Sequence, residues 1–257
     1  LLYSATFPYL KRVGWLVGLA LFDSARAASA GEGDLAIDRS LQSFRLGRIL
    51  LERPYLRETL AGASIMLVSL ERMRDVIYQF ESAFNAGKLK DVADSLASQR
   101  IREHRLPVAN YLAAQQIIER TYQPRGSVEA VKLAEVMSGA RVRSDRTLQR
   151  LSEAAFWDAR SGDQADWFDV NDKVKGVWAD WDKRWKLTDL YDPIFDIPSD
   201  FRKMDPNKFL AVYYPLNGVD EIFDVRFKLL LEIAGTVNSM GCVGFRLTNK
   251  TIPPQIA

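Results

Sequence analysis

The residue types best suited to chemistry gather in one segment, 157–205, which holds five of the six tryptophans and twelve aspartates. Tryptophan faces stack on sugar rings, and two carboxylates can serve as acid and as nucleophile or base in glycoside hydrolysis. We therefore expect any partner or ligand surface here. The residues assigned to it are Trp167, Trp178, Trp181, Trp185, Asp169 and Asp172.

Two other interpretations of this segment compete with a ligand surface. Trp178, Trp181 and Trp185 recur at helical spacing, which is typical of a packed core, so we expect most of these tryptophans to be sealed from solvent. Asp169 opens an aspartate-rich stretch, but the sixth position is Val174 instead of the glycine of a calcium loop, and the twelfth is Asp180 instead of glutamate. Caps, turns and a solvated helix face are the expected roles of these aspartates, and no metal site is predicted.

The single histidine and the single cysteine limit catalysis further. His104 lies in a charged run with no nucleophile near it in sequence, so a solvated helix end is expected. Cys242 alone can form neither an internal disulfide nor a cysteine-based zinc site, and we expect a buried small apolar side chain. No phosphate loop, nucleophile elbow or dinucleotide fingerprint occurs in the sequence, which argues against an enzyme and predicts no cofactor.

The net charge of the chain does not indicate a class of partner. Thirty-five basic residues face thirty-three acidic ones, a net charge of +2, which is too small to predict a nucleic-acid or anionic-membrane partner. A local basic run could bind phosphate, but Asp145 and Glu153 interrupt it, so a solvated helix surface is expected. The run consists of Arg141, Arg143, Arg146 and Arg150.

Apolar periodicity predicts an all-α fold of antiparallel helical hairpins in an irregular array, with little or no β-sheet. The strongest pattern covers 55–84, and it is preceded by helices over 8–30 and 35–53, with Asp34 as N-cap of the second. Asn85-Ala86-Gly87 is expected to end the third helix. Further helices are expected near 89–96, 107–122, 127–137, 144–156 and 219–241.

These elements suggest three segments. Residues 1–156 form the hairpin array, 157–205 a long packed connection with turns at Asp192-Pro193 and Pro198-Ser199, and 206–257 a closing helix and turn that joins the array in one domain. Within the closing segment, Gly241 and Gly244 are expected to loosen the chain after the helix.

The apolar run from Val13 to Phe22 is about half as long as a bilayer span requires, so it does not predict a transmembrane helix. The chain opens Leu1-Leu2-Tyr3 and stops at Ile256-Ala257 without a terminal signal. We therefore expect a processed or trimmed product whose targeting segment is absent.

Two stretches carry a family resemblance. The first is Gly33-Asp34-Leu35-Ala36 followed by Phe44-Arg45-Leu46-Gly47-Arg48 and Pro54, and the second is Leu229–Ala234 followed by Phe245-Arg246-Leu247 and Ile252–Ile256. Together they resemble an uncharacterised group of helical-hairpin proteins common in planctomycete-type bacteria, distantly tetratricopeptide-like, with a closing helix and proline turn similar to those of type II secretion pseudopilins. Lys250 and Ile252 replace that turn's glycine and tyrosine. The resemblance implies packing, brings no catalytic residues, and favours a periplasmic or membrane-associated location over a cytoplasmic one.

The leading expectation for function is a non-enzymatic scaffold or interaction domain that binds a protein partner or a second copy, because amphipathic helical hairpins offer broad faces. A membrane contact is expected only through a segment absent from this chain. The alternative is an envelope protein that binds or hydrolyses carbohydrate with the segment 157–205.

Overall fold

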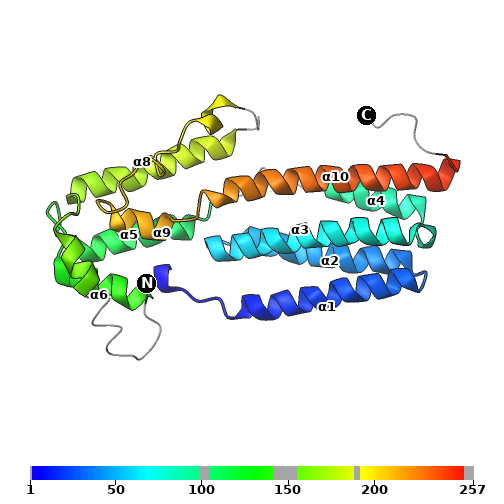
Figure 1. Ribbon diagram of the computed structural model, residues 1–257, viewed down its shortest axis with the longest axis horizontal. Helices are drawn as coiled ribbons and strands as arrows, with labels where there is room; N and C mark the ends of the chain where they lie inside the picture. The colour runs from blue at the N-terminus through cyan, green and yellow to red at the C-terminus, as the bar shows by residue number, and fades with distance from the viewer. Residues whose placement is uncertain (1, 99–104, 142–154, 188–191, 252–257) are drawn as a thin grey trace. The chain divides into compact units, whose positions relative to one another are not determined.

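The computed structural model describes residues 2–98, 105–141, 155–187 and 192–251 (Figure 1). In these ranges the regular structure is helical, with no strand and a single isolated bridge between Tyr122 and Val128. The predicted all-α fold is confirmed. The chain divides into two compact units. Unit 1 comprises Leu1–Thr6, Pro54–Leu56 and Leu106–Glu221, and unit 2 comprises Phe7–Arg53, Arg57–Arg105 and Ile222–Ala257.

Unit 2 is built from long helices that lie lengthwise beside one another (Figure 1). Four successive helices alternate in direction, and the last helix of the chain runs in the same direction as the first and third. They are α1 (Tyr9–Ser29), α2 (Gly33–Leu51), α3 (Leu56–Gln79), α4 (Ala86–Ala97) and α10 (Glu221–Asn249), with a short 3-10 turn η2 (Glu81–Ala83) before α4.

One main apolar core holds unit 2 together. It combines buried side chains of α2, α3, α4 and α10 with the C-terminal half of α1, where Ala27 and Ala28 are buried. The N-terminal half of α1 packs instead on a smaller cluster, in which Val17 and Leu21 contact Leu50 and Ile65. Because α1 meets the bundle along one side only, its opposite side faces outward.

Helices α2 and α3 approach each other closely where Gly47 of α2 faces Gly62 of α3. A Cβ atom added to Gly62 would lie 2.4 Å from the Gly47 carbonyl oxygen, and one added to Gly47 would lie 2.7 Å from the Gly62 carbonyl oxygen. Backbone touches backbone here, so any side chain at either position would force the helices apart.

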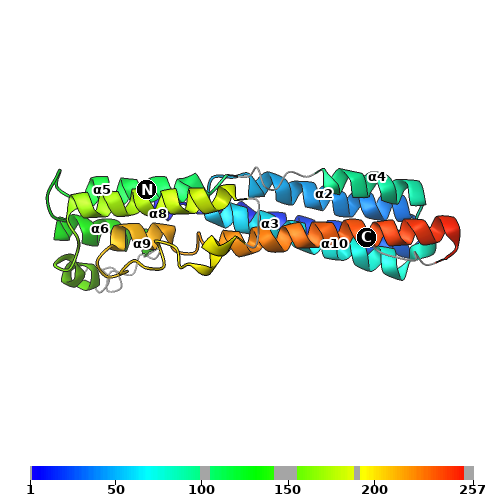
Figure 2. The same ribbon diagram turned by 90° about the horizontal axis from the view of Figure 1, so that it is seen from above.

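Unit 1 consists of helices of 7 to 20 residues joined by longer connections (Figures 1 and 2). Asn110 ties three of its parts together, because its side chain accepts a hydrogen bond from the Leu56 amide (3.0 Å) and donates one to the Pro215 carbonyl (2.8 Å). The helices are α5 (Val108–Thr121), α6 (Ala130–Arg141), a helical stretch over 155–161, α8 (Trp167–Lys186) and α9 (Leu210–Leu216), with 3-10 turns η1 (Leu2–Ser4) and η4 (Pro193–Asp196).

Several helix boundaries differ from the sequence predictions for local reasons. Asp34 lies in the first turn of α2 instead of capping it. Asn85, expected to end a helix, begins one, because its side chain accepts hydrogen bonds from the amides of Gly87 and Lys88 at the start of α4. The predicted loosening after Gly241 is wrong: α10 continues to Asn249, and Arg246 in its last turn forms an ion pair with Glu81.

The segment 157–205 is more helical than a long connection suggests. The twenty residues of α8 lie inside it, and Asp166 caps the helix by accepting a hydrogen bond from the Asp169 amide at 2.8 Å. Among the described residues, no helix combines the length and apolar character needed to cross a membrane.

Candidate interaction surface

The outward side of α1 carries a row of large apolar side chains in contact with solvent. Trp15, Leu16, Leu19 and Phe22 are 66%, 62%, 67% and 71% exposed. Two basic residues, Lys11 and Arg12, precede the row, and Arg26 follows it. We call these seven residues the α1 outer face.

The exposure follows from the sequence of α1. Ten consecutive residues, 13–22, carry no charge, and a helix that is apolar all round is normally buried on all sides. The bundle covers only the side that carries Val17 and Leu21. Each side chain of this size gains about 1.5–3 kcal/mol when it is fully buried, so the α1 outer face has a strong tendency to be covered.

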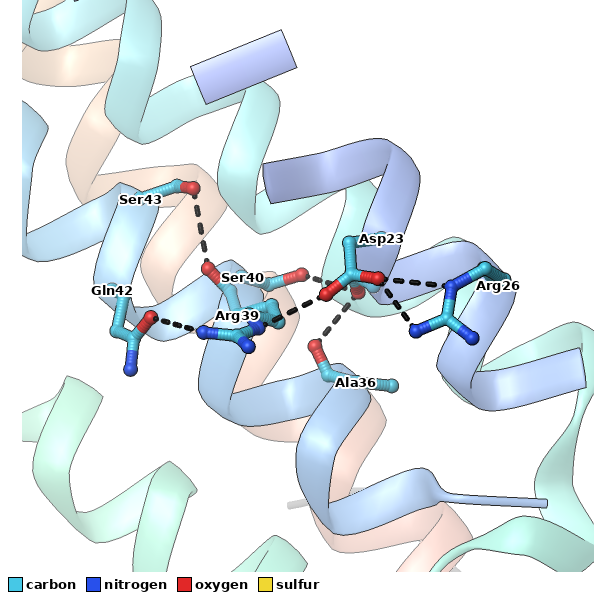
Figure 3. A network of polar contacts seen from close by, with 8 residues as sticks. Asp23, Arg26, Ala36, Arg39, Ser40, Gln42 and Ser43 are labelled. Atoms are coloured by element: carbon cyan, nitrogen blue, oxygen red, sulfur yellow. Dashed lines mark hydrogen bonds and ion pairs between the residues drawn. The ribbon is translucent and has the colours of Figure 1, made fainter. Parts of the chain in front are cut away.

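Hydrogen bonds fix the rotation of α1 on α2, and therefore the direction in which the face points (Figure 3). The Ser24 hydroxyl donates to the Ala36 carbonyl at 2.7 Å and lies 2.9 Å from the Ser40 hydroxyl. Both serines are fully buried. A buried hydroxyl without such partners would be costly, which disfavours other rotations of the helix.

Asp23 adds a second connection between the two helices. Its carboxylate accepts hydrogen bonds from Arg26 of α1 at 2.8 Å and from Arg39 of α2 at 3.1 Å (Figure 3). The hydrogen bond from Arg26 lowers the pKa of Asp23 most, and Arg39 adds to the effect. Asp23, the only acidic residue of α1, thus already has two guanidinium partners.

The first turn of α1 is held to α3. The Tyr9 hydroxyl donates a hydrogen bond to the Glu58 carboxylate. Partial burial, together with this carboxylate, raises the pKa of Tyr9 to about 12. Bonds at both ends of α1 therefore hold its apolar row in place without covering it.

Two glycines border the apolar row. A Cβ atom added to Gly14 or Gly18 would meet nothing within 4 Å, so packing inside the chain requires neither glycine. On the helix surface Gly18 lies next to Trp15 and Phe22, one turn after Gly14. A second backbone can approach closely where side chains are this small.

The structure places the predicted tryptophans mostly in the interior of unit 1. Trp181 is 1% and Trp185 7% exposed, and Trp157, outside the predicted set, is fully buried. Trp178 is half-buried, with its ring 5.0 Å from that of Tyr111 on α5. Trp167 is half-buried and meets Phe168 edge to face. The rings of Trp167 and Trp178 thus pack against aromatic rings of the protein itself.

Asp169 and Asp172 are both exposed and share a small pocket. Its volume is about 330 Å³, and Lys173, Asp200 and Phe209 also line it. Lys173 lies 5.3 Å from the centre of the Phe209 ring. The structure therefore brings the two predicted aspartates together, while none of the predicted tryptophans lines their pocket.

Asp180 of α8 has a structural role. The Asp180 carboxylate accepts two hydrogen bonds from the Arg184 guanidinium, each 3.0 Å long, and one from the Asp200 amide at 3.1 Å. Arg184 also donates to the Ile194 carbonyl at 2.7 Å. This ion pair is largely buried and fastens the chain around η4 to α8.

A second hollow lies in unit 2 between α4 and α10. It has a volume of about 630 Å³, with Lys90 and Asp94 on one wall and Cys242 and Phe245 on the other. Cys242 is half-buried, in contrast to the buried side chain that the sequence predicted. No feature of its lining indicates a particular ligand.

Possible metal ligands do not cluster in the described ranges. There, no group of three or more histidine, cysteine, aspartate or glutamate side chains is arranged to hold a metal ion. His104, Arg143, Arg146 and Arg150 lie outside the residues that the structure describes, as does the side chain of Arg141.

Sequence reasoning missed the α1 outer face. The run 13–22 was expected to lie in the helix over 8–30 and not to span a membrane, but the exposure of one apolar side of this helix was not predicted. The signal was present, since an uncharged run of ten residues is wider than one packing face needs. Comparison with known protein families, with characterised proteins and with solved structures finds no match for this chain.

Proposed function

We propose that this chain is a non-enzymatic helical scaffold that binds another protein chain through the α1 outer face, with one helix of the partner packed along it. The observation that carries the proposal is the row Trp15, Leu16, Leu19 and Phe22, all exposed on a helix whose orientation is fixed. Aromatic and aliphatic side chains that project from a rigid helix are typical anchors of protein interfaces.

The spacing within the row supports a helix as the occupant. Trp15, Leu19 and Phe22 are separated by four and then three residues, the step that keeps one side of a helix against a neighbouring helix. Gly18 beside them lowers the surface so that a second helix can come close. A bacterial envelope setting is part of the proposal and rests on the sequence resemblance alone.

Capture from native extract with matched variants tests the proposal. Immobilised wild-type chain is expected to retain a protein partner, and Leu19→Glu is expected to lose it, because a charge would then lie in the middle of the row. The control is Leu231→Glu on α10 of the same unit, which changes a side chain that is 66% exposed. Equal capture by wild type and Leu19→Glu would contradict the proposal.

The pocket beside α8 supports the alternative function, carbohydrate binding, on one observation. Asp169, Asp172 and Asp200 gather around a hollow with Phe209 on its wall, a combination of carboxylates and an aromatic ring that suits a sugar. Glycan-array binding that disappears in Asp172→Asn would support this function. Binding unaffected by that change would remove it.

A further inference from the structure

The charges of the α1 outer face are arranged symmetrically about its apolar row. Arg12, Leu19 and Arg26 are spaced by seven residues, and so are Trp15 and Phe22 between them. These positions form one heptad seam with arginine at both ends and apolar side chains in the middle. The two arginines are separated by about 21 Å along the helix axis.

Each basic end is available to a partner. Arg12 is exposed, and Lys11 next to it lies 5.3 Å from the centre of the Trp15 ring. The Arg26 side chain is 59% exposed although it contacts Asp23. Because two arginines already contact Asp23, the charge that the row presents at its ends is positive.

We infer that the occupant of this face is an acidic amphipathic helix of a different protein, with apolar residues along its seam and a carboxylate at each end of the apolar stretch. This inference rests on the proposed function, and it specifies the chemistry of the partner. On the partner helix we expect the two carboxylates to be fourteen positions apart, which matches the spacing of Arg12 and Arg26.

The same charges disfavour a second copy of the chain. An antiparallel copy that brings Trp15 level with Phe22 also brings Lys11 level with Arg26. A parallel copy in the same register brings Arg12 to Arg12 and Arg26 to Arg26. Either arrangement places like charges at both ends of the seam, and like charges across a helix interface destabilise it.

A membrane surface fits less well than a protein helix. The chain as a whole is nearly neutral, with a net charge of +2, so long-range attraction to anionic lipid is weak. The heptad spacing, moreover, matches one neighbouring helix and has no counterpart in a lipid surface.

Two synthetic peptides test the inference with the whole chain. Both form a helix with leucine at the seam positions over two heptads; one has glutamate and the other lysine at the two end positions fourteen residues apart. Fluorescence anisotropy is expected to give at least about tenfold tighter binding of the glutamate peptide, with the ratio falling as salt rises from low to high.

Variants connect the binding to α1. Leu19→Glu is expected to abolish binding of both peptides, whereas Leu231→Glu binds as wild type. The double variant Lys11→Glu with Arg12→Glu removes the basic end without touching the Ser24 and Asp23 contacts, and it is expected to bring the ratio of the two affinities to about one or below. Circular dichroism confirms that each variant retains its helix content.

The outcomes separate the inference from the proposed function. Binding that depends on Leu19 but does not distinguish the two peptides overturns the inference and leaves the function. A dimer seen by light scattering that Leu19→Glu dissociates has the same meaning. Binding of phosphatidylglycerol vesicles through Leu19, with neither peptide bound, overturns the inference and also contradicts the proposed function. Loss of any dependence on Leu19 in every assay, native extract included, overturns both.

Discussion

Helices α1 and α8 contain similar residues at similar spacing, yet they use them in opposite ways. On α8, Trp181 and Trp185 are buried against the rest of unit 1. On α1, Trp15, Leu19 and Phe22 stand in solvent. The difference lies in the neighbouring segments. The chain around η4 covers α8, and hydrogen bonds of Asp180 and Arg184 hold it there. No described segment of unit 2 covers the outer side of α1. Apolar spacing identifies a face to be covered, but not what covers it.

The largest effect is expected for Trp181→Ala. Removing a side chain that is 1% exposed leaves a cavity beside Phe201 and should lower the free energy of unfolding by about 3–5 kcal/mol. Urea unfolding followed by circular dichroism measures it. The matched control is Phe168→Ala on the same helix, 51% exposed, which should cost about 1 kcal/mol or less. Equal losses would show that α8 is not packed as described.

A slightly smaller loss is expected for Arg184→Ala, which leaves the Asp180 carboxylate without its guanidinium partner. Breaking a largely buried ion pair costs about 3 kcal/mol. Lys183→Ala, which changes an exposed neighbour, serves as the control. If the Asp180–Arg184 pair is what holds the chain around η4 on α8, a protease should cleave Arg184→Ala near residues 192–200 faster than it cleaves Lys183→Ala.

Two leucines on α1 test the comparison within a single helix. Leu21→Ala removes a side chain that is 6% exposed and should cost about 2–3 kcal/mol, whereas Leu19→Ala, at 67% exposed, should change stability by less than about 0.5 kcal/mol. Thermal unfolding of the two variants and the wild type measures both changes in stability. A large loss in Leu19→Ala would mean that the α1 outer face is covered within the chain itself.

The smallest effect concerns the hydrogen bond from Tyr9 to Glu58. Because the pKa of Tyr9 rises from 10.0 to about 12 on folding, its contribution is complete below pH 10 and is lost as the pH rises towards 12. Tyr9→Phe should cost about 1 kcal/mol at neutral pH and should flatten the decline in stability above pH 10. Tyr78→Phe, on an 81% exposed ring, should keep the wild-type pH profile.

Helical periodicity predicted the fold class and most helices, because the core positions of unit 2 recur at helical steps. Boundaries were harder to predict where one residue suits two roles: Asn85 favours both a helix end and a helix start, and only its hydrogen bonds to the Gly87 and Lys88 amides decide between them. Gly241 and Gly244 were expected to end α10, but contacts made beyond them, such as that of Arg246 with Glu81, outweigh the low helix propensity of glycine.

The candidate site was predicted less well than the fold. Sequence spacing does bring Asp169 and Asp172 to one pocket, since three residues are close to one helical turn. The burial of Trp181 depends instead on Phe201, twenty residues away, whose position no local pattern predicts. The α1 outer face was missed for the related reason that exposure is decided by which neighbours are present.

The contact between Gly47 and Gly62 has a consequence for how the α2–α3 hairpin finds its alignment during folding. Sliding one helix by a turn would put Ser43 or Leu51 in the place that Gly47 occupies opposite Gly62, and either side chain would hold the backbones apart. Only the native alignment lets the two helix backbones touch. A pairing shifted by one turn therefore loses van der Waals contacts along the whole α2–α3 interface. Because the two glycines are only fifteen positions apart in the sequence, they can meet early in folding, at a small cost in chain entropy and before α10 is in place.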